Sequence, residues 1–271
     1  MAVYVWGDTH GNFVKSRDGR IAGEFAQLII WANENELTEN DTVIILGDNG
    51  LNFHYGWKDL NKKKQLAKYT KCNFFILRGN HDVRPEDYYN RPAANAYNGD
   101  CPAARAHKEE WFGNTVLVDD QFPTLKFAKD GLIYDIEDKK VLVIGGGYSV
   151  DKFYRLENNW PWIRNEMLND NELEVIYNTY CNNIVDVVLS HVAPVSFESY
   201  YRHLFMKDGE ITGGWGSIDK SMEIWMNKLL WDETNDIKLW YFGHLHDNMN
   251  CGDIGVMVYN KPLLFGERYN D

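Results

Sequence analysis

The residues with the clearest capacity for chemistry are carboxylates, imidazoles and an amide that recur in short polar turns along the chain. They are Asp8, His10, Asp48, Asn80, His191, His244 and His246. Carboxylate, amide and imidazole groups together form a mixed oxygen and nitrogen donor set that suits divalent transition metals. Seven donors are enough for two ions, so the sequence predicts a metal centre if these turns meet in space.

The spacing of the donors supports this interpretation. Asp8 and His10 are two residues apart, as are His244 and His246, and side chains at i and i+2 of extended backbone point the same way. A glycine directly precedes four of the seven donors and lets the chain turn sharply beside a ligand. Asp48 lies midway in the order and can bridge two ions. Independent structural turns are the alternative, and they leave the match to metal chemistry unexplained.

The elements that must position these donors are apolar runs of about five residues, which are typical of buried strands. The runs are residues 3–6, 42–46, 73–77, 184–189 and 237–242. Helical periodicity predicts helices over 25–32, 57–71 and 164–180. Strand–helix alternation near the start of the chain predicts parallel strands, whose carboxyl ends share the edge at which ligands bind. We therefore expect the polar turns to converge on one site.

Composition excludes several classes of protein. The 271 residues are 44% apolar and 25% charged, as in an ordinary globular protein. No apolar run reaches about 18 residues and no signal peptide opens the chain, so we expect no membrane partner and a cytoplasmic location. The net charge of −12 disfavours stable binding of duplex nucleic acid. The four cysteines show no CxxC pairing and are expected to be free thiols.

The chain has no repeat, low-complexity tract or linker, so the sequence predicts a single domain over residues 1–271 with an insertion around 83–112. A further strand over 141–144 runs into the glycines at 145–147. That run lacks the GxGxxG and GxxxxGK[ST] patterns and is a weak signal of a phosphate loop. The oligomeric state is left open, because the Trp-rich stretches suit a core or an interface.

Five segments resemble the signature blocks of the calcineurin-like metallophosphoesterases. They are DTH (8–10), GDNG (47–50), LRGNHD (77–82), SHVAP (190–194) and GHLH (243–246). GGGYSVDKFYR at 145–155 and WPW at 160–162 also resemble the bacterial and phage branch of that superfamily. The blocks span nearly the whole chain. The resemblance implies an α/β fold, a four-layer α/β/β/α sandwich with two mixed β-sheets.

The resemblance also implies how the donors are shared between two divalent metal ions. One ion is held by Asp8, His10, Asp48 and His246. The other is held by Asp48, Asn80, His191 and His244, with Asp48 as the bridge. Two cations about 3.5–4 Å apart make a bridging hydroxide available for attack on phosphorus. Mn2+ is the expected metal, and Fe or Zn also suit these ligands.

Three further residues are candidates for catalysis and substrate binding. His81 resembles the family histidine that protonates the leaving oxygen, with a structural histidine as the alternative. Arg78 resembles the arginine that grips phosphate in phosphoprotein phosphatases, and an ion pair with a carboxylate is its alternative role. Arg155 is a second candidate for that grip.

One position departs from the pattern of the phosphoprotein phosphatases. Those enzymes have GDxxD, in which the second Asp orients the catalytic histidine, and Leu51 stands there in this chain. Asp82 is then the candidate to orient His81. His54 is the first alternative as the acid.

The resemblance implies a hydrolase of phosphate esters, with a phosphorylated small molecule or a phosphoprotein as the partner. The LRGNHD block favours a phosphomonoesterase or phosphoprotein phosphatase. The missing second Asp favours a phosphodiesterase or nuclease acting on nucleotides. A catalytically silent scaffold is the third alternative, and it is disfavoured because this chain keeps a candidate for every ligand.

Overall fold

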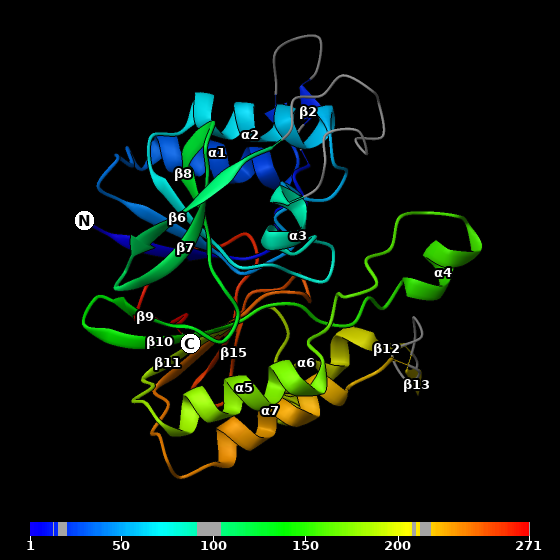
Figure 1. Ribbon diagram of the computed structural model, residues 1–271. Coiled ribbons are helices and arrows are strands. Elements are labelled where there is room, and N and C mark those ends of the chain that lie inside the picture. Colours follow the sequence, from blue (N-terminus) through cyan, green and yellow to red (C-terminus); the bar gives the residue numbers. More distant parts are fainter. Residues whose placement is uncertain (13, 16–20, 91–103, 208–209, 212–217, 271) are drawn as a thin grey trace.

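The computed structural model describes residues 1–271 except 13, 16–20, 91–103, 208–209, 212–217 and 271. Two β-sheets pack face to face, and helices cover the outer face of each sheet (Figure 1). The predicted four-layer α/β/β/α sandwich with two mixed sheets is therefore confirmed.

The first sheet has seven strands in the order β17-β1-β4-β5-β8-β7-β6. They are β1 (Val3–Trp6), β4 (Thr42–Ile45), β5 (Asn73–Ile76), β6 (Ala106–Trp111), β7 (Asn114–Asp119), β8 (Phe122–Phe127) and β17 (Leu263–Leu264). β1, β4, β5 and β8 are parallel neighbours, which confirms the expected parallel pairing at the start of the chain. The turns that carry Asp8, Asp48 and Asn80 consequently leave the same edge of this sheet.

The second sheet has six strands in the order β15-β16-β14-β11-β10-β9. They are β9 (Ile133–Ile136), β10 (Lys139–Ile144), β11 (Val187–Ser190), β14 (Leu239–Phe242), β15 (Met249–Cys251) and β16 (Gly255–Met257). β10, β11, β14 and β16 are parallel neighbours, whereas β9 and β15 pair antiparallel at the edges. His191 and His244 follow the two central strands of this sheet.

Helices α1 (Glu24–Glu34) and α2 (Trp57–Tyr69) pack on the first sheet, and α5 (Asp170–Cys181) and α7 (Ser221–Trp231) pack on the second. The helix expected from residue 164 begins instead at Asp170, because Asn169 and Glu172 form a capping box there. The short elements are α3 (Pro85–Tyr89), α4 (Lys152–Glu157), α6 (Glu198–Tyr201), η2 (Val195–Phe197), η3 (Arg202–Phe205), β2 (Val14–Lys15), β3 (Ile21–Ala22), β12 (Met206–Lys207) and β13 (Glu210–Ile211).

Alternate residues of the central strands face different layers, as the period of a strand requires. In β4, Ile44 packs between the two sheets, while Val43 and Ile45 pack on the helix side with α1 and α2. In β11, Leu189 packs between the sheets and Val188 packs on the side of α5 and α7. Continuous apolar runs are therefore buried on both faces, and the sheets hold the turns at their ends in fixed positions.

Residues 91–103 of the expected insertion lie outside the described residues, and α3 and β6 lie on either side of them. Cys72, Cys181 and Cys251 are free thiols, and Cys101 lies outside the described residues. Within the part of the chain that the structure describes, no helix is long and apolar enough to cross a membrane.

Candidate metal centre

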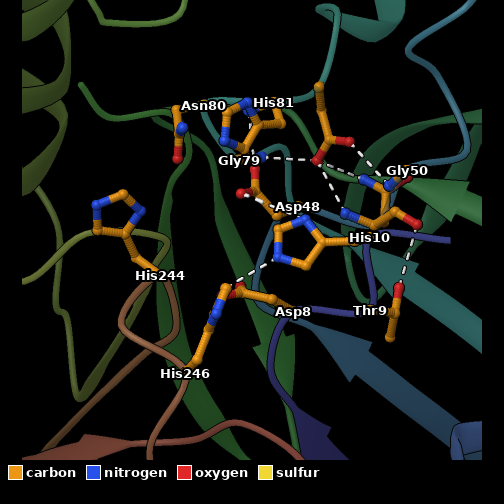
Figure 2. A network of polar contacts seen from close by, with 12 residues as sticks. Asp8, Thr9, His10, Asp48, Gly50, Gly79, Asn80, His81, His244 and His246 are labelled. Carbon is orange, nitrogen blue, oxygen red and sulfur yellow. Dashed lines mark hydrogen bonds and ion pairs between the residues drawn. The ribbon is translucent and has the colours of Figure 1, made fainter. Parts of the chain in front are cut away.

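The polar turns that follow β1, β4, β5 and β14 come together where the two sheets meet (Figure 2), and His191, which follows β11, contacts Asn80 and His244 there. The first three strands belong to one sheet and the last two belong to the other. Residues as far apart in sequence as His10 and His246 are in direct contact as a result. The expected convergence of the seven donors is what the structure contains, and they form two groups with Asp48 between them.

Asp8, His10 and His246 form the first group. The Nε2 atoms of His10 and His246 lie 2.9 Å apart, and Nε2 of His246 lies 3.2 Å from Oδ2 of Asp8. One donor atom from each residue lies within 4.8 Å of the other two. Apart from the contact with His246, the buried oxygens of Asp8 have no hydrogen-bond partner. A cation would satisfy this carboxylate and the facing imidazole nitrogens together.

Asn80, His191 and His244 form the second group. Nε2 of His191 lies 2.8 Å from Oδ1 of Asn80 and 3.2 Å from Nδ1 of His244. Nδ1 of His191 lies 2.8 Å from the carbonyl oxygen of Leu46, so Nδ1 carries the proton and Nε2 is an acceptor in the neutral ring. The amide nitrogen of Asn80 donates to Ser149, which leaves its oxygen facing His191. Two facing acceptors are the arrangement that a metal ion requires.

Asp48 lies between the two groups. Its Oδ2 lies 3.9 Å from Nδ1 of His10, and its Oδ1 lies 3.5 Å from Nε2 of His191. Oδ1 also accepts the backbone N–H of His81 at 2.8 Å. Burial, together with the negative charges of Asp8 and Asp82, raises the pKa of Asp48 well above its usual value. An ionised carboxylate at this place therefore needs nearby cations.

Three of the four donor imidazoles favour the neutral form that binds metal ions. Burial lowers the pKa of His10, His191 and His244. His246 differs, because its contact with Asp8 raises its pKa above the usual value. For Asp8, burial acts to raise the pKa, but the contact with His246 and the nearby imidazole charges outweigh it and lower the pKa. Asp8 is thus an anion in a setting that favours cations.

The backbone at the donors adopts a conformation that side-chain-bearing residues rarely take. The φ angles of His10, Asp48, His244 and His246 are 45°, 42°, 70° and 56°. A left-handed conformation costs a non-glycine residue about 1–3 kcal/mol and persists only where the surrounding structure imposes it. Four of the seven donors are strained in this way, which is a pattern of functional sites.

Glycines at two of the turns make the close approach possible. A Cβ atom on Gly79 would lie 2.0 Å from Oδ1 of Asp48 and 2.3 Å from its backbone nitrogen. Gly47 has a φ of +96°, and a Cβ atom there would lie 2.4 Å from Nδ1 of His191. Any side chain at either position would displace a donor.

The match to known proteins agrees with this geometry. The family model described as calcineurin-like phosphoesterase matches residues 1–248 of the chain, which include all seven donors. The chain belongs to the calcineurin-like phosphoesterase family. No curated protein matches it. The family is one of metal-dependent hydrolases of phosphoester bonds, and the carboxylate, amide and imidazole groups described above fit divalent metal ions.

His81, the candidate acid, lies beside the first donor group. The centres of its ring and the ring of His10 are 6.1 Å apart. Its Nε2 lies 3.9 Å from Oδ1 of Asp151, an oxygen that is buried and has no hydrogen-bond partner. The other oxygen of Asp151 accepts from Nε of Arg155 at 2.7 Å. The carboxylate beside the ring of His81 is therefore that of Asp151, while Asp48 accepts the backbone N–H of His81.

The expectation that Asp82 orients His81 is corrected by these contacts. The oxygens of Asp82 accept the backbone N–H groups of Asn49, Gly50 and Gly79, and one of them also accepts the side-chain amide of Asn49. Asp82 thus joins the turn after β4 to the turn after β5. Leu51, which stands where the phosphatase pattern has its second Asp, is fully buried in the core beneath α1 and α2.

Arg78 is buried and its guanidinium group has local partners. Its Nε donates to Oδ2 of Asp130 at 2.7 Å, and its Nη1 donates to the carbonyl oxygen of Glu166 at 2.7 Å. A Cβ atom on Gly146 would lie 2.4 Å from Nη1, so the backbone of the glycine run covers the guanidinium group. The structure places Arg78 in an ion pair with Asp130, which is the alternative that the sequence left open, while its buried Nη2 has no hydrogen-bond partner.

Arg155 is bonded to Asp151, the carboxylate beside the ring of His81. It lies next to His81 through Asp151, and its charge lowers the pKa of both His81 and Asp48, after the larger effects of burial. The stretch 145–155 supplies both Arg155 and Asp151, together with the hydroxyl of Ser149 that accepts from Asn80. In the sequence, Asp151 was indicated only by the resemblance of this stretch to the bacterial branch of the family. That resemblance assigns no role to Asp151.

Proposed function

We propose that this protein is a two-metal phosphomonoesterase acting on phosphorylated small molecules or phosphoproteins. One ion is held by Asp8, His10, Asp48 and His246. The other is held by Asp48, Asn80, His191 and His244. The observation that carries the proposal is the position of Asp48, whose two oxygens lie toward different donor groups.

When bound, two divalent cations supply Lewis acidity, which makes a nucleophilic oxygen available near neutral pH and offsets the charge on the phosphoryl oxygens. Mn2+ is the proposed metal, and Fe and Zn are the alternatives that this donor set accepts. The chain itself fixes the orientation of the metal-binding side chains. The bond from Nδ1 of His191 to the carbonyl of Leu46 fixes the tautomer, and the bond from Asn80 to Ser149 fixes the amide.

Burial and the charge of Arg155 lower the pKa of His81 to about 3, so His81 is an acid only when the negative charge of a bound phosphate ester raises that pKa. It then gives a proton from its ring to the leaving oxygen, which is a poor leaving group when it departs as an alkoxide. Asp151 holds the ring in position from a distance of 3.9 Å. Separations of this size in a protein without substrate shorten when the reacting groups are in place. Asp151 is thus a positioning residue and takes the role of the second Asp of the phosphatase pattern, whose place in this chain is held by Leu51.

The positive charge of Arg155 favours a phosphate monoester over a diester as the substrate. A phosphate monoester carries one more negative charge than a diester near neutral pH, and a cationic side chain next to His81 complements that charge. Arg155 is largely buried, with 17% of its side chain exposed, so solvent screens its charge only in part.

The first experiment measures metal content and substrate class on the same reconstituted protein. We expect two Mn2+ ions per chain and faster turnover of p-nitrophenyl phosphate than of bis(p-nitrophenyl) phosphate. At most one ion would contradict the two-metal centre. Faster turnover of the diester would favour a phosphodiesterase, and two ions without turnover of any ester would favour a scaffold.

The second experiment tests the role of His81. His81→Ala should keep both ions, lose about 10²–10⁴-fold of its activity on an alkyl phosphate, and lose much less on p-nitrophenyl phosphate, because p-nitrophenolate leaves without a proton. His107→Ala is the matched control, since His107 is on the surface in β6. An equal loss on both substrates would remove the acid role from His81, and His54 would be the next residue to replace.

A further inference from the structure

A cavity of about 640 Å³ lies between two segments that the metal centre does not use. One wall is residues 53–58, which lead into α2, and the other wall is residues 159–165, which follow α4. Val83, two residues after His81, lies in the lining between them. The volume falls in the range of roughly 300–1,000 Å³ that is typical of small-molecule sites. We call this the aromatic cavity.

The lining of the aromatic cavity is rich in large flat side chains. Trp57 and Phe53 are on the first wall, and Trp160 and Trp162 are on the second. Trp57 is 42% exposed and Trp160 is 53% exposed. Large apolar side chains that cluster at a concave surface are typical of a binding site, whereas single exposed apolar side chains are not.

The first wall is held in place by one buried carboxylate. Asp59 accepts the backbone N–H groups of Phe53, His54 and Tyr55 at 2.8–3.1 Å. Asp59 itself is fully buried in the first turn of α2. Fixing three consecutive amides in this way preforms the wall, and a preformed wall loses less conformational entropy when a ligand binds.

The second wall is fastened to the motif that carries His81. Arg84, three residues after His81, donates to the carbonyl oxygens of Asn165 at 3.3 Å and Met167 at 3.0 Å. Nη1 of Arg155 lies 3.3 Å from the carbonyl oxygen of Pro161. The same arginine bonds to Asp151, the neighbour of His81. Arg155 thus links Pro161 in the second wall to Asp151 beside the ring of His81, and Val83 of the lining is two residues from His81 along the chain.

We propose that the aromatic cavity binds the base of a nucleotide whose phosphate group lies at the metal centre. The proposal rests on the proposed phosphoesterase function for the position of the phosphate. A planar base can stack on indole rings, and such stacking tolerates any base because each has a π-face. Arg164 and Lys58 outnumber the one carboxylate of the lining, that of Asp87, so the lining carries positive charge in a protein of net charge −12. This combination suits a single small nucleotide rather than a polynucleotide.

Binding of a nucleoside tests the cavity without the metal centre. Calorimetry with adenosine, guanosine, cytidine and uridine on the metal-free protein should detect binding of at least one of them. Trp160→Ala and Trp57→Ala should each weaken that binding by about 5- to 150-fold, the factor that corresponds to about 1–3 kcal/mol of stacking. Trp160→Phe should recover most of the affinity, because a phenyl ring still stacks.

Trp231→Ala is the matched control, since Trp231 is 70% exposed at the end of α7 and is not part of the lining. It should bind the nucleoside as the unsubstituted protein does. Absence of binding by all four nucleosides, or equal affinity in Trp160→Ala, Trp57→Ala and Trp231→Ala, would overturn the proposal.

Kinetics on the metal-loaded protein separates this proposal from the proposed function. KM for adenosine 5′-monophosphate should be at least 5-fold below KM for ribose 5-phosphate, which lacks the base, and Trp160→Ala should raise only the first. Nucleoside binding without turnover would refute the phosphoesterase and keep the cavity. Turnover with equal KM values would refute the cavity and keep the phosphoesterase. Preference for a phosphotyrosine peptide over every nucleotide would overturn the nucleotide assignment.

Discussion

Replacing Asp48 with Asn should have opposite effects on the protein without metal ions and with them. Asp48 is only 2% exposed, and the negative charges of Asp8 and Asp82 act on it. Asn has nearly the same shape, and its oxygen can still accept the N–H of His81 that Asp48 accepts at 2.8 Å. The substitution therefore removes a buried charge and leaves the packing intact.

The magnitudes follow from the burial and from binding linkage. Without metal ions, loss of the buried charge should stabilise the fold by about 1–2 kcal/mol, which raises Tm by about 2–8 °C in a protein of this size. With Mn2+ at about 100 times its Kd, each site adds about 2.7 kcal/mol, so two sites raise Tm of the unsubstituted protein by about 10–20 °C. Asp48→Asn should lose more than half of that gain, because both ions share this carboxylate.

Thermal unfolding in EDTA and in a Mn2+ titration measures both effects. Asp236→Asn is the control, since Asp236 is 84% exposed and far less able to perturb the fold by charge removal. The reasoning is refuted if Asp48→Asn lowers Tm in EDTA, or if it keeps the full Mn2+-dependent rise. If Asp48→Asn lost only the part of the Mn2+-dependent rise in Tm that comes from one site, Asp48 would bind a single ion.

Two more predictions concern the glycine turn and a buried acid. Gly79→Ala should reduce Mn2+ affinity at least 10-fold, because its Cβ would lie 2.0 Å from Oδ1 of Asp48, and calorimetric titration of Mn2+ at unchanged affinity would contradict this. Burial, with Asp219 and Glu198 nearby, raises the pKa of Glu223 from 4.5 to about 7. The folded state thus favours protonated Glu223, so stability is lost as pH rises from about 4.5 to about 7. Glu223→Gln should match the unsubstituted protein near pH 4.5 and exceed it by up to about 3 kcal/mol in urea unfolding at pH 8. Equal stability of the two proteins at pH 8 would show that Glu223 is not buried as a charge.

The parallel strands and the convergence of the donors could be predicted from local patterns in the sequence, whereas the two-sheet sandwich was predicted from the family resemblance. Apolar runs such as 42–46 and 73–77 give strands, and the helical pattern over 57–71 gives the intervening crossover. A polar residue directly after such a strand must lie at its carboxyl end. Asp48 and Asn80 therefore had to lie on neighbouring turns once β4 and β5 paired in parallel.

The ends of the helices and the partners of individual side chains were harder to predict from the sequence. The helix predicted from residue 164 begins at Asp170, because the cap formed by Asn169 competes with the periodicity of the preceding residues. Arg78 was a candidate for the phosphate, and its partner Asp130 comes from a distant loop that no local pattern connects to it. Asp82 directly follows His81, yet it bonds to the turn after β4.

The sequence by itself determined which residue types stand at the strand ends, since a strand and its turn are encoded within about ten consecutive residues. Only the tertiary structure decided which carboxylate faces His81 and what stands beside the metal centre. Asp151 is 70 residues from His81, and Trp160 is about 100 residues from Trp57 across the aromatic cavity. Contacts of this kind depend on the packing of two sheets against each other, which a single sequence does not encode locally.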